Sequence, residues 1–198
     1  NEGKVALRNL SLWSRELQPT DIGLLYRQTD IDSIIAATDG SMKEYNAGYG
    51  TVWAMKDNII HREHGAVHGD QTVFRGEALA LNKLLESTPR EKPLVVAIDS
   101  EALLAGVKSR TRRFKKRNLN DHNDSELLMT QHQLLRGRTN TITLVKVRAH
   151  TGDPLIEDAD SSAKLGTCLA RQILPFEHPK KVIFTAGNAL NVWCKKTQ

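Results

Sequence analysis

Short apolar runs separated by turn-forming residues predict three consecutive strands in the first half of the chain. Residues 33–38, with the sequence SIIAAT, form a run of the length expected for a buried strand. Similar runs follow at residues 47–55 and 59–67, and the KDN sequence between them favours a turn, so these two strands should form a hairpin. Before the strands, residues 6–17 have the spacing of a short amphipathic helix, which Pro19 would end.

Apolar residues at helical spacing then alternate with further apolar runs. Residues 72–88 repeat apolar side chains three and four positions apart, and Thr72 is expected to cap this helix. The remaining predicted elements are a strand at 94–99, a helix at 100–108, a helix at 124–138, a strand at 141–150 and a helix at 156–174. Sequential strands followed by alternating helices and strands predict an α/β fold, in which helices cover a mixed sheet.

Four acidic residues stand at or near the junctions of these elements. Asp39 and Asp99 end apolar strands, Glu77 lies on or near the apolar face of a helix, and Asp160 lies in the first turns of the last helix. A carboxylate beside a buried strand costs several kcal/mol unless a partner compensates its charge. Carboxylate oxygens without nitrogen or sulfur ligands favour a hard divalent ion, Mg²⁺ or Mn²⁺.

Each of these acids also has an ordinary structural explanation. Asp39 begins an Asp-Gly-Ser sequence that is common in turns, and Asp99 precedes a serine that can cap a helix. Glu77 could be a surface residue of its helix, and Asp160 could simply favour a helix N-terminus. A shared metal site explains all four positions at once, whereas the ordinary explanations must each hold separately.

The formal net charge of +5 favours a polyanionic partner, and the clustering of basic residues in one segment supports the same interpretation. Residues 108–117 contain seven basic residues and no acid. One alternative is a solvated loop, and the other is an edge that contacts phosphates, with Phe114 available to stack. The basic residues are Lys108, Arg110, Arg112, Arg113, Lys115, Lys116 and Arg117.

Composition limits the class of protein. The hydrophobic content of 39% is enough for one core in a chain of 198 residues. No stretch approaches ~18 uncharged apolar residues, so no membrane span is expected, and the N-terminus lacks a secretory pattern. The two cysteines have no metal-type spacing and favour a reducing, intracellular setting, nucleus or cytoplasm. His61, His64 and His68 are expected at the surface rather than around zinc.

Four segments, TDGS, RGEALAL, IDS and VRAHTGDPLIEDADSSA, occur in the order of the signature segments of type 1 ribonuclease H. Residues 34–174 resemble that family, and the last segment fits its spacing at His150, Gly152, Asp160 and Ala163. TVFRGEALAL and IDSEALL are most similar to the ribonuclease H domains of retroelements, especially non-LTR retrotransposons.

The resemblance implies a five-stranded sheet whose first three strands are antiparallel. It also implies an endonuclease that hydrolyses the RNA strand of RNA/DNA hybrids by a two-metal-ion mechanism, using Mg²⁺ or Mn²⁺ and leaving 5′-phosphate and 3′-hydroxyl ends. The implied catalytic residues are the metal ligands Asp39, Glu77, Asp99 and Asp160, with His150 near the scissile phosphate. Nucleic-acid contacts are expected from Ser41, Thr72, Arg75 and the basic residues of 108–117.

Some positions depart from the family pattern. Many members have Asn-Glu where this chain has Ile156 and Glu157. Many cellular members have two amides that read the minor groove where this chain has Val73 and Phe74, so strand discrimination would rest on other groups.

Two alternative functions stay open, namely a catalytically silent nucleic-acid-binding or assembly module and a DNA-directed nuclease of the same fold.

The resemblance also suggests how the chain is divided. Residues 34–174 would form the ribonuclease H domain, and residues 175–198 a C-terminal extension. Residues 1–33 would be an N-terminal extension or a connection from an upstream polymerase. A first residue other than Met fits a piece of a longer protein.

Overall fold

A mixed sheet of six strands runs through the part of the chain that the computed structural model describes, residues 10–17, 32–56, 58–113, 124–150 and 152–173. The strands are β1 (Leu10–Leu17), β2 (Ile34–Lys43), β3 (Asn46–Met55), β4 (Asn58–Ala66), β5 (Leu94–Ile98) and β6 (Ile142–Val147). Their order across the sheet is β1-β6-β5-β2-β3-β4. β2, β3 and β4 pair antiparallel, whereas β1, β6, β5 and β2 run parallel. The predicted α/β class and the antiparallel pairing of the three sequential strands are confirmed.

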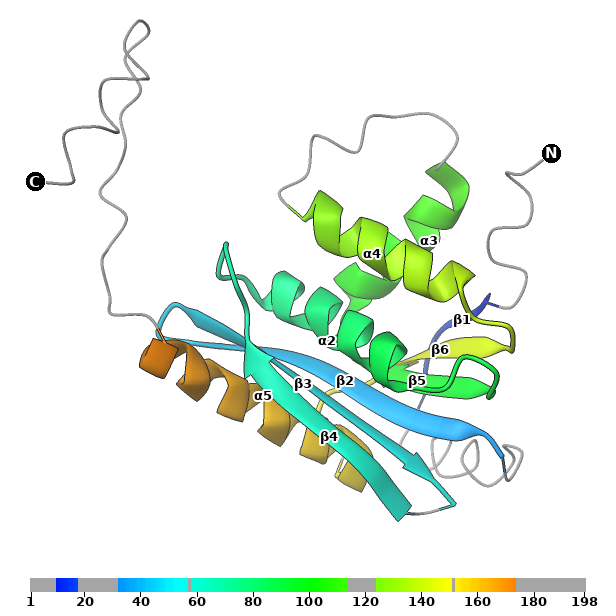
Figure 1. The fold of residues 1–198 in the computed structure, drawn as a ribbon, viewed down its shortest axis with the longest axis horizontal. Coiled ribbons are helices and arrows are strands. Elements are labelled where there is room, and N and C mark those ends of the chain that lie inside the picture. The colour runs from blue at the N-terminus through cyan, green and yellow to red at the C-terminus, as the bar shows by residue number, and fades with distance from the viewer. Residues whose placement is uncertain (1–9, 18–31, 57, 114–123, 151, 174–198) are drawn as a thin grey trace, which may run out of the picture.

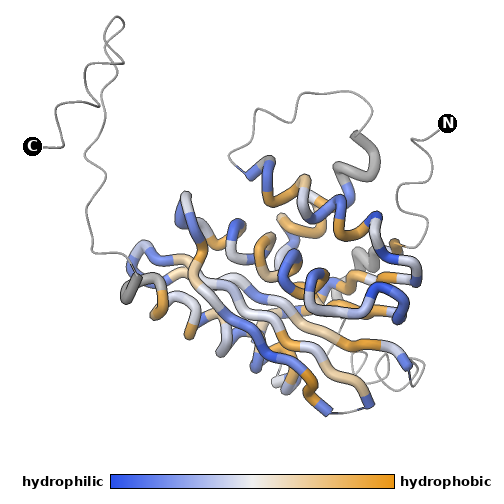
Figure 2. The backbone as a smooth tube through the Cα atoms, viewed as in Figure 1, coloured by the Kyte–Doolittle hydropathy of each residue, from blue (hydrophilic) through white to orange (hydrophobic). Residues whose placement is uncertain are grey.

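Helices cover both faces of this sheet (Figure 1). The helices are α2 (Val73–Ser87), α3 (Glu101–Arg113), α4 (Ser125–Arg136) and α5 (Pro154–Ile173). One apolar cluster, which includes Ile34, Leu81 and Leu144, lies between the sheet and α2 with its neighbours, and a second, which includes Val52 and Ala159, lies between the sheet and α5. Figure 2 shows hydrophilic colour over much of the edge strand β4, which agrees with the exposure of many of its side chains. None of the helices in the described ranges combines the length and apolar composition needed to cross a lipid bilayer.

The N-terminal segment contains a strand, so the prediction of a helix at residues 6–17 is wrong. β1 pairs in parallel with β6, with Leu10 opposite Ile142 and Leu12 opposite Leu144. Leu10, Ser11 and Leu12 alternate apolar and polar side chains, the period of a strand. β6, which pairs with β5 on one side, pairs with this segment on the other. β1 therefore makes the sheet six-stranded instead of five-stranded.

Two other elements differ in length from their predicted ranges. α3 continues to Arg113, so the first part of the basic run lies inside a helix, although the run was expected to follow the helix. β6 ends at Val147, three residues before His150, so this histidine lies in the connection to α5. The helix predicted at 72–88 agrees closely with α2, and the Oγ1 atom of Thr72 accepts a hydrogen bond from the Arg75 backbone N–H, as a helix cap does.

Glycines on β2 and β3 let two helices lie directly against the sheet backbone. A Cβ atom at Gly40 would come within 2.4 Å of the Glu77 backbone nitrogen, and one at Gly50 would come within 2.3 Å of the carbonyl oxygen of Ala159 and the nitrogen of Ala163. No side chain fits at these distances. The close approach places the Glu77 turn of α2 and the Asp160 turn of α5 beside the sheet.

The close approach of α5 to β3 leads to a prediction for Gly50→Ala. The added methyl group would push α5 away, and we expect overpacking of this kind to lower the free energy of unfolding by about 1–3 kcal/mol. Urea denaturation measures the change. Gly106→Ala is the matched control, because among the described residues its Cβ would meet only the Phe74 ring, at 4.0 Å, and alanine favours a helix interior. Equal stability of Gly50→Ala and the unchanged chain would contradict the packing argument.

Candidate active site

Asp39 and Asp99 directly follow the last residues that pair β2 with β5. β2 and β5 are parallel neighbours, and Thr38 of β2 is paired with Ile98 of β5. The next residue of each segment, Asp39 or Asp99, therefore lies at the same position along the strand direction. Asp99 comes directly after β5, whereas β2 continues past Asp39 in its pairing with β3. The two carboxylates therefore meet at the carboxyl end of parallel strands, where open α/β sheets place binding sites.

The two helices contribute the other acids. Glu77, in the second turn of α2, is only 4% exposed. Its carboxylate forms a cluster with Asp39 and Asp99 in which the three ligand oxygens lie within 4.8 Å of one another. Asp160 of α5 forms an adjacent cluster with His150 and Glu157, again within 4.8 Å. All six residues line the same pocket, so the structure brings together the four acids that the sequence singled out.

Burial and mutual repulsion disfavour the charged forms of these acids. Burial raises the pKa of Asp39 to about 7, and the charges of Asp99 and Asp160 add to the effect. Burial also raises the pKa of Glu77, to about 9, with further contributions from Asp39 and Asp99. The pKa of Asp99 is raised by burial as well, although the nearby Lys146 ammonium opposes this shift. A bound cation would reverse these effects, because it favours the carboxylate form.

The same cluster leaves oxygen atoms unsatisfied. Among the described residues, the Oε2 atom of Glu77 and the Oδ1 atom of Asp99 are buried and accept no hydrogen bond. Buried oxygens of this kind are costly unless they are paired or bind a metal. A set of converging carboxylate oxygens is the donor set of a hard divalent cation. The residues present therefore fit a divalent metal ion.

His150 lies at the exposed rim of the pocket. Its backbone has a φ of 53°, a value that few residues other than glycine adopt readily. Gly152, two residues later, has a φ of 77°. The Gly152 N–H donates a hydrogen bond of 3.2 Å to the Oε1 atom of Glu157, which ties this turn to the first turn of α5. The His150 Nδ1 atom is 4.0 Å from the Oδ2 atom of Asp160, and the His150 side chain is 70% exposed. Glu157, which follows the departure from the family pattern at Ile156, thus supports the turn that presents His150.

Comparison of the sequence with models of known protein families identifies the family of this chain. The family model described as RNase H matches residues 32–167, more than half of the 198 residues. This chain belongs to the RNase H family. It is therefore a ribonuclease H enzyme, and the family resemblance read from its sequence segments is confirmed. A search of curated proteins finds no match.

Solved structures resemble the fold of this RNase H. RNase H1 from the halophilic archaeon Halobacterium salinarum NRC-1 is 21% identical, with a TM-score of 0.52, and the match covers 68% of this chain and 96% of that one. LC11-RNase H1, solved in complex with an RNA/DNA hybrid, is 19% identical, with a TM-score of 0.51, and the match covers 67% of this chain and 98% of that one. Both likenesses agree with the mixed sheet and the flanking helices described above.

Two lysines of this RNase H contact the site, and the sequence reading missed both. The Lys146 Nζ atom of β6 donates to the carbonyl oxygens of Asp99, at 2.5 Å, and Val147, at 3.0 Å. The Lys164 Nζ atom of α5 lies 2.6 Å from the Oδ2 atom of Asp160. The sequence held a signal for each: Lys146 interrupts the buried positions of β6, and Lys164 stands four residues after Asp160, one helical turn away.

The residues predicted to contact nucleic acid lie in different surroundings. Ser41 lines the acidic pocket. Thr72 caps α2 through its side chain. Arg75 is held by other protein groups, because its Nη1 atom is 2.9 Å from Asp124 Oδ1 and its Nη2 atom donates to the His68 carbonyl. That pairing leaves the Arg75 side chain 16% exposed, so its contact with nucleic acid stays a prediction.

The basic run lies only partly within the described residues. Lys108 is an exposed residue of α3. The backbone of α3 includes Arg110, Arg112 and Arg113, but their side chains lie outside the described part of the structure. Lys115, Lys116 and Arg117 lie wholly outside it. The phosphate-contacting role of this run therefore stays a prediction from the sequence.

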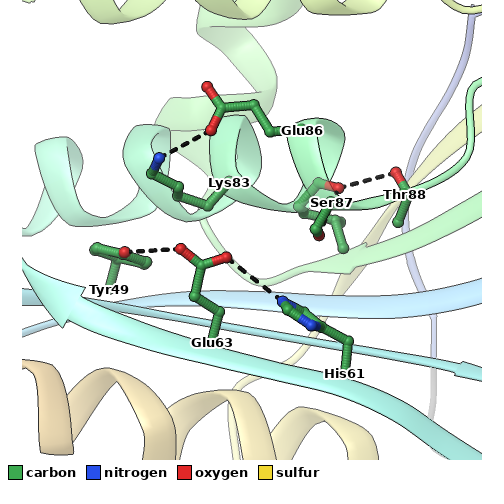
Figure 3. A network of polar contacts seen from close by, with 8 residues as sticks. Tyr49, His61, Glu63, Lys83, Glu86, Ser87 and Thr88 are labelled. Atoms are coloured by element: carbon green, nitrogen blue, oxygen red, sulfur yellow. Dashed lines mark hydrogen bonds and ion pairs between the residues drawn. The ribbon is translucent and has the colours of Figure 1, made fainter.

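A second polar network lies between β3, β4 and α2 (Figure 3). The Tyr49 hydroxyl donates to Glu63 Oε1 at 3.0 Å, and the other oxygen of Glu63 lies 3.5 Å from His61 Nε2. His61 also stacks on Trp53, with 6.0 Å between the ring centroids. These contacts account for the position of His61, and none of these residues lines the acidic pocket.

Proposed function

We propose that this RNase H is an endonuclease that hydrolyses the RNA strand of RNA/DNA hybrids and leaves 5′-phosphate and 3′-hydroxyl ends. The observation that supports it most is the convergence of Asp39, Glu77 and Asp99 within 4.8 Å, with Asp160 in the same pocket. Membership of the RNase H family and the likeness to LC11-RNase H1, whose structure contains an RNA/DNA hybrid, support the choice of substrate. The presence of all four acids disfavours a catalytically silent module.

Asp39, Glu77, Asp99 and Asp160 would hold Mg²⁺ ions, and Mn²⁺ would satisfy the same oxygen ligands. When bound, a pair of divalent ions supplies activation of the attacking water and stabilisation of the departing oxygen. Asp39 interacts with acids of both clusters. It shares one cluster with Glu77 and Asp99, and the charge of Asp160 also acts on it.

His150 and the helix cap would act on the substrate around this centre. The exposed His150 side chain, on its strained turn, is placed to accept or deliver a proton or to help the product leave. Ser41 and Thr72 would contact the nucleic-acid backbone, together with the basic residues of 108–117. The side chains of Val73 and Phe74 have no amide group that could read the minor groove. Recognition of the 2′-hydroxyl groups by other residues would therefore select the RNA strand.

The subfamily and the division of the chain belong to the same proposal. TVFRGEALAL and IDSEALL support a retroelement ribonuclease H, of the non-LTR retrotransposon kind. Residues 34–174 would form the catalytic domain, and residues 175–198 a C-terminal extension. Residues 1–33 would connect it to an upstream polymerase region. This connection would contain β1, which extends the sheet at β6.

A cleavage assay with three duplexes tests the function. End-labelled RNA/DNA, RNA/RNA and DNA/DNA duplexes of one sequence are incubated with the full chain in Mg²⁺, in Mn²⁺ or with a chelator. We expect cuts only in the RNA strand of the hybrid and only with a divalent ion. Product ends that accept label from polynucleotide kinase only after phosphatase treatment would carry the expected 5′-phosphate. Binding of the hybrid without cleavage would favour the silent module, and cleavage of DNA/DNA would favour a DNA-directed nuclease.

A further inference from the structure

The two halves of the acidic pocket differ in how their oxygens are occupied. In the half formed by Asp39, Glu77 and Asp99, carboxylate oxygens of Glu77 and Asp99 lack hydrogen-bond partners among the described residues. Lys146 is near this half: its ammonium acts on the charge of Asp99 and donates to the carbonyl oxygens of Asp99 and Val147. In the other half, the Oδ2 atom of Asp160 already has a cation, the Lys164 ammonium at 2.6 Å.

The Lys164 ammonium occupies a position that matters for cation binding. The Oδ2 atom that it contacts also lies 4.0 Å from His150, so this oxygen is on the side of Asp160 that meets the cluster with Glu157. The negative charges of Asp39 and Glu157 attract the same ammonium. A divalent ion that bound Asp160 would stand within a few ångströms of this positive charge and would be repelled by it.

The ammonium can leave this position at small cost. The Lys164 side chain is 60% exposed, whereas the Asp160 side chain is 16% exposed, so the lysine can swing into solvent while the aspartate stays in the pocket. Water and salt screen the exposed ammonium end of this pair, which limits the free energy lost when the lysine moves away. Lys164 would therefore weaken cation binding at Asp160 severalfold without preventing it.

We propose that Lys164 is a built-in counter-ion of Asp160 that competes with the divalent cation for this half of the site. The inference rests on the proposed function, in which both halves bind divalent ions. It follows that the half formed by Asp39, Glu77 and Asp99 fills first. The Asp160 half fills at a higher cation concentration, which Lys164 sets.

Calorimetric titration of Mg²⁺ into the full chain, without nucleic acid, tests this competition. We expect Lys164→Met to tighten the weaker binding event about two- to fivefold and to leave the stronger event unchanged. Lys164→Arg keeps the charge and should behave as the unchanged chain does. Lys83→Met is the matched control, because Lys83 also pairs with a carboxylate on its own helix, Glu86 at 2.8 Å, but Glu86 does not line the pocket, whereas Asp160 does. Circular dichroism spectra establish that each variant is folded.

Different outcomes separate this inference from the proposed function. An unchanged weaker event in Lys164→Met overturns the inference, and so does an equal tightening in Lys83→Met, which would be a general effect of net charge. If the unchanged chain still cleaves the hybrid in these cases, the proposed function stands. A chain that neither binds Mg²⁺ nor cleaves the hybrid would overturn both.

Discussion

Asp39→Asn is expected to lower kcat for hybrid cleavage by about a thousandfold or more while hybrid binding survives. Asp39 shares a cluster with Glu77 and Asp99 and also interacts with Asp160, so its replacement weakens the cation ligands of both halves of the pocket. A divalent ion provides several kcal/mol of charge stabilisation, and each ~1.4 kcal/mol corresponds to a tenfold change in rate. Asp99→Asn should have a comparable effect, because Asp99 lies in the same cluster.

Single-turnover cleavage and fluorescence anisotropy measure the two quantities separately. Asp158→Asn is the matched control on the same helix as Asp160. Asp158 pairs with Arg62 at 2.6 Å, across to β4, and does not line the pocket. We expect this control to retain the cleavage rate. Full activity of Asp39→Asn or Asp99→Asn would remove the assignment of these acids as metal ligands, whereas loss of hybrid binding would point to misfolding.

The positions of Asp39 and Asp99 at the ends of strand pairing could be read from the sequence, because local patterns decide where they lie. An apolar run that ends in an acid occurs at both Asp39 and Asp99, and neighbouring parallel strands end at the same edge of a sheet. Glu77 and Asp160 needed an additional fact, namely how closely α2 and α5 approach the sheet. Gly40 and Gly50 permit that approach, yet a glycine in a sequence does not reveal which helix will lie against it.

Features that depend on distant contacts escaped prediction. Residues 10–17 suit a helix or a strand, and pairing with β6, which lies far away in the sequence, decides between the two. The pairing of Arg75 with Asp124 could not be predicted, because the two residues lie 49 positions apart in the chain. Lys146 could be recognised as a site residue only when the end of β5 was placed beside it.

In the absence of divalent ions, the free energy of unfolding should fall as the pH rises from about 4 to about 9. Burial raises the pKa of Asp39 from its usual 3.8 to about 7 and that of Glu77 from 4.5 to about 9. A raised carboxyl pKa means that the folded state holds its proton more tightly than the unfolded state does. The resulting stabilisation is complete below the usual pKa and is lost as the pH passes the raised one. Each carboxyl group contributes at most about 1.4 kcal/mol per pH unit.

Mg²⁺ should reduce this loss, because a cation that binds the carboxylates stabilises the folded state where they are ionised. Urea denaturation across the pH range, with Mg²⁺ or with a chelator, measures both effects. Glu77→Gln should remove much of the fall between about pH 7 and about pH 9, because the amide does not ionise. Glu86→Gln is the matched control, since Glu86 is an exposed acid on the same helix and pairs with Lys83 outside the pocket. Two results would contradict this prediction: a free energy of unfolding that does not change with pH in the presence of chelator, or one that falls equally with Mg²⁺ present. Either result would mean that ionisation of these buried carboxyl groups does not couple proton and cation binding to folding.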